Sequence, residues 1–177
     1  MGEIKSTLDI VMEKTKHLTL SEQEKQDQKK KEARQNLSGL LQKYQDTLID
    51  FESLKDKLDE LQKSSSFIDT HIVIREVLDR IDLDQDNTSL INILDTIGHG
   101  DTGRLKTVLS DYRDTVGREG DKRSDQAKEK LASGYRISGT AVLPNIAGDD
   151  KWQAYLLRIR TDFLQRFNRE KAALAKE

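Results

Sequence analysis

Acidic side chains at alternate positions, Asp82, Asp84 and Asp86, form the pattern in this sequence that is best suited to binding an ion. Calcium loops begin in this way, because a hard cation takes several oxygen ligands. Such a loop has glycine at its sixth position and a bidentate glutamate at its twelfth. These positions hold Asn87 and Ile93 here. The sequence therefore predicts a solvated acidic loop, with weak ion binding as the alternative.

A second pattern is the run Gly98–Gly103, whose three glycines match the G-x-G-x-x-G spacing of phosphate-binding turns. In such turns the glycines let backbone amides approach a pyrophosphate at the start of a helix. The motif requires a preceding strand, but the residues before Gly98 have the periodicity of a helix. We expect a corner between two helices, where Gly98 ends one and Asp101 begins the next. A ligand- or ion-responsive module that uses this corner or the Asp82–Asn87 loop is the alternative function.

The other reactive residue types form no catalytic or metal-binding pattern. The three histidines, His17, His71 and His99, lie far apart, and no pair has the spacing of zinc ligands. The chain has no cysteine, so it has no thiolate nucleophile, disulfide or sulfur-ligated zinc. No G-x-S-x-G nucleophile motif occurs. The sequence predicts a protein that is not an enzyme and uses no cofactor or metal.

Charge composition restricts the class of partner. The 30 basic and 32 acidic residues are intermixed and give a net charge of −2. A chain like this has no strong field to attract nucleic acid or an anionic membrane. No stretch approaches the roughly 18 apolar residues of a membrane span, and the N-terminus lacks the apolar core of a signal peptide. We expect a cytoplasmic protein that binds neither nucleic acid nor membranes.

The elements that hold these residues are predicted to be helices, because 35% of the residues are charged and only 5% are aromatic. The clearest periodic signal is a heptad seam, in which apolar residues recur at intervals of seven and three. It consists of Leu37, Leu40, Tyr44, Phe51, Leu54, Leu58 and Leu61. Such a stripe requires a covering helix, so we predict that these residues bind a partner, with a second copy as the first expectation. Pairing within one chain fits the seam equally well.

Five segments follow from the distribution of apolar and charged residues. They are an amphipathic helix over 1–20, a long helix with the seam over 21–63, a compact helical subdomain over 67–117, a charged linker with a short extended segment over 118–148, and an amphipathic helix over 149–177. In the linker, residues 118–134 fit either a solvated helix or a flexible chain. The extended segment is 135–144, which is β-branched and ends in proline. At 67–81 a helix is favoured, although alternation at 68–74 makes a strand the alternative.

The predicted fold is therefore mainly all-α, with a long helical or coiled-coil arm, a small helical bundle and one short extended segment. Such a protein is expected to act through protein–protein association, as an adaptor, scaffold or chaperone-like accessory factor. Its predicted partner is another protein or a second copy of the chain.

Overall fold

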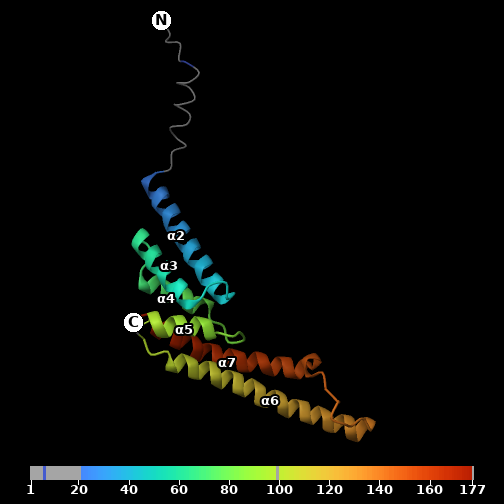
Figure 1. The fold of residues 1–177 in the computed structure, drawn as a ribbon. Coiled ribbons are helices and arrows are strands. Elements are labelled where there is room, and N and C mark those ends of the chain that lie inside the picture. The colour runs from blue at the N-terminus through green and yellow to red at the C-terminus, as the bar shows by residue number, and fades with distance from the viewer. Residues whose placement is uncertain (1–5, 7–20, 99, 177) are drawn as a thin grey trace. The chain divides into compact units, whose positions relative to one another are not determined.

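The computed structural model describes residues 6, 21–98 and 100–176 of the 177-residue chain. Its α-helices are α2 (Glu22–Gln45), α3 (Phe51–Ser64), α4 (Thr70–Arg80), α5 (Thr88–Ile97), α6 (Gly103–Tyr135) and α7 (Asp150–Leu174), with the short 3₁₀ helix η2 (Ile146–Gly148) (Figure 1). None of the described residues lies in a strand, so the predicted mainly all-α fold is confirmed. The predicted helix over 1–20 lies outside the described residues. The chain divides into two compact units, with the boundary after Asp69.

The first unit contains α2 and α3, which pack against each other as an antiparallel hairpin (Figure 1). A reciprocal capping box begins α2: the Ser21 hydroxyl accepts from the Glu24 amide at 3.1 Å, and the Glu24 carboxylate accepts from the Ser21 amide at 2.7 Å. These bonds satisfy two amides that a helix N-terminus leaves without partners. The Ser-x-x-Glu spacing thus accounts for where α2 starts.

The predicted continuous helix over 21–63 is wrong, because α2 ends at Gln45 and the chain reverses. Within the turn, Thr47 has left-handed backbone with φ of 57°. Asp50 then caps α3 by accepting from the Ser53 amide at 2.8 Å. The reversal is favourable because it brings the two halves of the apolar seam together within one chain. No glycine or proline marks the turn, so the residue pattern did not reveal it.

The second unit begins with α4 and α5, two short helices that pack against each other. The helix predicted within 67–81 is confirmed from Thr70 onward, and the strand alternative is wrong. Apolar side chains from α4, α5 and the first half of α6 are buried: Val73, Ile74, Val77, Leu78, Leu90, Ile93, Leu94, Leu105, Val108, Leu109 and Tyr112. This core fixes one end of α6.

The rest of the second unit is an antiparallel pair formed by α6 and α7 (Figure 1). The register is set by Tyr112 against Phe163, with ring centroids 5.5 Å apart, and by Arg123, whose Nε donates to Asp149 at 2.9 Å. Helix α6 passes through Gly117 and ends at Tyr135, so residues 118–135 are helix rather than linker. It extends 12 residues beyond Arg123, about 18 Å at the standard rise.

The predicted extended segment 135–144 forms no strand. Its residues belong to the connection 136–149, which we call the distal loop and which returns the chain from α6 to α7. Arg136 adopts left-handed backbone with φ of 55°, and the Ile137 amide donates to the Leu131 carbonyl at 3.1 Å. A turn follows, in which the Val142 amide donates to the Gly139 carbonyl at 3.2 Å. Local turn bonds therefore replace the strand pairing that the β-branched residues suggested.

Candidate functional site

The heptad seam is covered largely within the chain. Leu37, Leu54 and Leu58 are buried, while the other four seam residues are half-buried: Leu40, Tyr44, Phe51 and Leu61. The rings of Tyr44 and Phe51 meet edge to face with their centroids 5.9 Å apart. The three buried leucines are thus inaccessible to another chain while the hairpin is formed.

The Asp82–Asn87 loop is organised by its own side chains. Asn87 is buried, accepts from the Asp82 amide at 3.1 Å and donates to the Asp82 carbonyl at 2.6 Å. Asp86 accepts from the Thr88 amide at 3.0 Å, at the start of α5. No group of three or more His, Cys, Asp or Glu side chains within the described parts of the chain is arranged to hold a metal ion.

Asp84 links this loop to α6 and α7. It accepts from the Tyr112 hydroxyl at 2.5 Å and from Arg160 Nε at 2.6 Å. Burial raises the pKa of Asp84, but the hydrogen bonds from Tyr112 and Arg160 outweigh it and leave that pKa below its usual value. Burial, together with the bond to Asp84, raises the pKa of Tyr112 to about 12. The loop carboxylate therefore connects three elements of the second unit.

The Gly98–Gly103 run forms a helix junction, as the sequence predicts, but α6 begins at Gly103 rather than at Asp101, whose carboxylate accepts from the Gly103 amide at 2.8 Å. His99 lies outside the described residues. Gly98 ends α5, and a Cβ there would lie 2.5 Å from the Leu94 carbonyl oxygen, so a side chain does not fit. Across the junction, Asp95 accepts from the Thr102 hydroxyl and pairs with Lys106 Nζ at 2.7 Å. The hydrogen bond from Lys106 is the main cause that lowers the pKa of Asp95.

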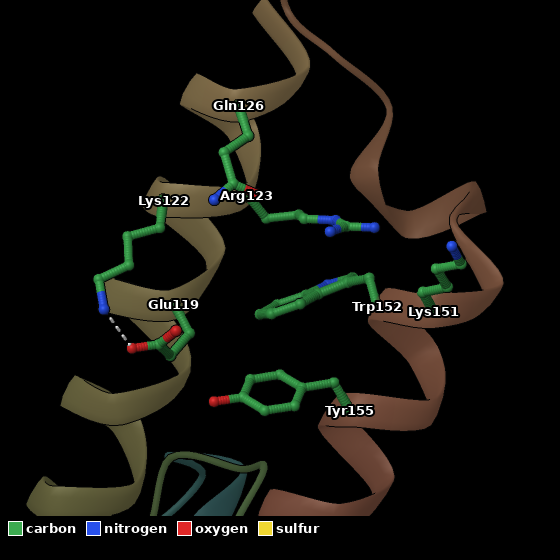
Figure 2. Close-up of a pocket in the computed structure, with 7 residues that line it drawn as sticks. All are labelled: Glu119, Lys122, Arg123, Gln126, Lys151, Trp152 and Tyr155. Atoms are coloured by element: carbon green, nitrogen blue, oxygen red, sulfur yellow. Dashed lines mark hydrogen bonds and ion pairs between the residues drawn. The ribbon is translucent and has the colours of Figure 1, made fainter.

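An aromatic cavity of about 210 Å³ opens between α6 and α7 (Figure 2). Trp152 is 7% exposed and lies between the Arg123 side chain and the Tyr155 ring (Figure 2). On the α6 side, Lys122 Nζ pairs with Glu119 at 2.7 Å. The hydrogen bond from Arg123 is the largest cause that lowers the pKa of Asp149. The cavity thus offers an aromatic wall beside ion pairs.

Three large apolar side chains are exposed where α6 enters the distal loop. Tyr135 is 74% exposed, Ile137 48% and Leu143 87%. We call these three residues the apolar tip. The spacing of these residues in the sequence does not mark them as a site, although the distribution of charge gives a signal. Charged residues make up 35% of the chain, but positions 130–148 contain only two of them, Lys130 and Arg136, and neither is acidic.

A second cavity, of about 590 Å³, lies beside α6 at the acidic loop. We call it the α6 groove. It is lined by Leu83, Asp84, Gln85, Asp86, Thr88, Tyr112, Arg113 and Val116. The groove therefore combines apolar side chains with two carboxylates and one guanidinium.

Comparison of the chain with protein-family models, curated proteins and solved structures finds no match. None of the helices in the described residues is long and apolar enough to cross a membrane.

Proposed function

We propose that the protein works by binding other proteins, as an adaptor, scaffold or chaperone-like accessory factor, and not by catalysis. The observation that carries this proposal is the exposure of Tyr135, Ile137 and Leu143 within one nine-residue stretch. Clustered exposed apolar side chains mark interaction sites in soluble proteins. Covering them would contribute roughly 25 cal/mol for each Å² of apolar surface removed from water.

The heptad seam is a second candidate contact surface for a protein partner. Leu40, Tyr44, Phe51 and Leu61 are half-buried and present a smaller apolar surface to a partner. The cytoplasm remains the proposed location, which the absence of cysteine supports. The intermixed charges support a protein partner over nucleic acid or a membrane.

Site-specific photo-crosslinking in the cells that make the protein tests the proposal. A photoreactive amino acid at position 143 should form adducts with a polypeptide, because Leu143 is at the proposed contact. The control position is Arg158, which is exposed on α7 and outside the apolar tip. Adducts that are absent at 143, or the same from both positions, would contradict the proposal.

The alternative function, a ligand- or ion-responsive module, depends on the Asp82–Asn87 loop or the Gly98–Gly103 corner. It has weaker support, because Asp84 and Asp86 bond to groups of the fold itself. Calorimetric titration with calcium and with nucleotides tests it. Saturable heat at a stoichiometry of one would favour the alternative over protein association.

A further inference from the structure

We propose that the apolar tip docks into the α6 groove of a second copy of this chain, so that two copies associate reciprocally. This inference rests on the proposed function, since it names the partner of the same tip.

Charge favours the groove, and not the tip of a second copy, as the surface that the tip contacts. The stretch around the tip carries Lys130 and Arg136 without any carboxylate, so two tips facing each other would repel. The groove is lined by Asp84, Asp86 and Arg113, and Arg160 pairs with Asp84 and with the neighbouring Asp82, so these carboxylates exceed the guanidinium groups by one negative charge. These carboxylates bond to Tyr112, Arg160 and Thr88, yet a carboxylate accepts more hydrogen bonds than these. A basic tip is therefore complementary to the groove.

The groove has room for apolar side chains of the tip. Its volume of about 590 Å³ lies in the range typical of sites that enclose a ligand. Val116 is half-buried and contributes apolar surface, while Leu83 and Tyr112, which also line the groove, are mostly buried. A leucine such as Leu143, which is 87% exposed, would exchange water for these side chains.

The positions on α6 require a second copy. Val116 lines the groove and Tyr135 begins the tip, and the 19 residues of helical rise between them amount to about 29 Å. A continuous helix holds the two surfaces apart, so the tip cannot reach the groove of its own chain. A two-fold axis perpendicular to α6 near Ser124 reverses the helix direction. It places each tip beside the groove of the other copy, in an isologous interface that closes.

Charges near the middle of α6 are compatible with this arrangement. Asp121 and Lys128 are both exposed and lie three and four residues on either side of Ser124. In two antiparallel copies, Asp121 of one lies at the level of Lys128 of the other, which pairs with Asp125 of its own chain at 3.5 Å. The pairing occurs twice because of the symmetry.

Light scattering on the full chain tests the inference. The wild-type protein should show about twice its 20.3 kDa mass. Leu143→Asp in the tip and Val116→Lys in the groove should each weaken self-association by about tenfold or more, since a charge is forced into an apolar contact. The matched control is Leu157→Asp on α7, which is 66% exposed but lies outside both surfaces, and should remain dimeric.

Mixing the two variants gives the sharper result. A Leu143→Asp chain keeps an intact groove and a Val116→Lys chain keeps an intact tip, so the mixture should regain dimers through one of the two contacts. Val116 is half-buried, so Gln85→Lys, at an exposed lining residue, serves as the second groove variant. Circular dichroism verifies that each variant is folded.

Three outcomes would overturn the inference. If the wild-type chain is monomeric but still crosslinks to a different protein from position 143, a second copy is not the partner, and the proposed function remains intact. If the tip variant weakens the dimer but neither groove variant does, the groove is not the surface that the tip contacts. A monomeric chain that forms no adduct from position 143 contradicts the inference and the proposed function together.

Discussion

The α2–α3 and α6–α7 hairpins are both antiparallel pairs of helices, yet they expose different numbers of large apolar side chains where the chain reverses. The turn of the first spans residues 46–50 and exposes one large apolar side chain, Leu48 at 71%, while Leu54 beside it is fully buried. The connection of the second spans residues 136–149, and Leu143 within it is 87% exposed. A helix that outruns its partner leaves its last turns and its connection without a covering surface. The unequal hairpin therefore has the larger exposed apolar surface at its reversal.

The largest effect expected from this comparison is on stability. Leu54→Ala should lower the free energy of unfolding by about 2–5 kcal/mol, because it leaves a cavity in the α2–α3 contact. Leu143→Ala, at the exposed tip, should change it by less than about 0.5 kcal/mol. Urea unfolding followed by circular dichroism measures both, and similar losses would contradict the difference between the hairpins.

Alkaline pH should act on the second unit through Tyr112. Its pKa of about 12 lies above the value of about 10 expected in an unfolded chain. A raised pKa means that the neutral phenol is stabilised by folding, so this contribution is complete below pH 10 and is lost as pH rises through about 12. The difference between the absorbance titrations of the wild-type protein and the Tyr112→Phe variant should show one phenol that ionises near pH 12. A component near pH 10 would show that neither the burial of Tyr112 nor its bond to Asp84 raises its pKa.

Acidic pH should act on the second unit through Asp149. Folding lowers its pKa, so its contribution is present above the unfolded value of about 3.9 and is lost as pH falls through the folded value. The wild-type urea midpoint should therefore fall more between pH 6 and pH 3 than that of Asp149→Asn. Arg123→Gln, which removes the partner, should reduce the pH dependence in the same direction. Equal slopes for all three proteins would exclude this pair as a source of acid sensitivity.

The smallest expected effect comes from replacing the left-handed residue in each of the two connections by glycine. Thr47 and Arg136 both have left-handed backbone, which costs a residue with a Cβ roughly 1 kcal/mol and glycine almost nothing. Thr47→Gly should raise the free energy of unfolding by up to about 1 kcal/mol, and Arg136→Gly should raise it less because arginine is not β-branched. Thermal unfolding measures both, and a loss at position 47 would show that the turn does not require this conformation.

The sequence was sufficient to predict the helical class and most helix faces, because apolar spacing reports directly on burial. It was not sufficient to predict the reversal at residues 46–50. Tyr44 and Phe51 keep heptad spacing across that turn, so a straight helix and a hairpin share one apolar pattern. The hairpin forms because two half-length stripes can cover each other, which is a tertiary effect.

The apolar tip was missed for a different reason. Gly117 resembles a helix end, but the charged residues after it have good helix propensity, and Trp152 packs against α6 near Gly120. Only the resulting length of α6 shows that Tyr135 projects beyond α7. The lack of carboxylates over 130–148 was visible in the sequence, although spacing alone did not connect it with exposure.

Trp152 gives the molecule a built-in optical reporter. It is the only tryptophan of the chain, it is nearly enclosed, and it packs against α6 within the second unit. Its fluorescence therefore reports directly on the separation of α6 from α7. Emission and far-ultraviolet dichroism, recorded on one sample, would show whether the two units unfold together or in sequence.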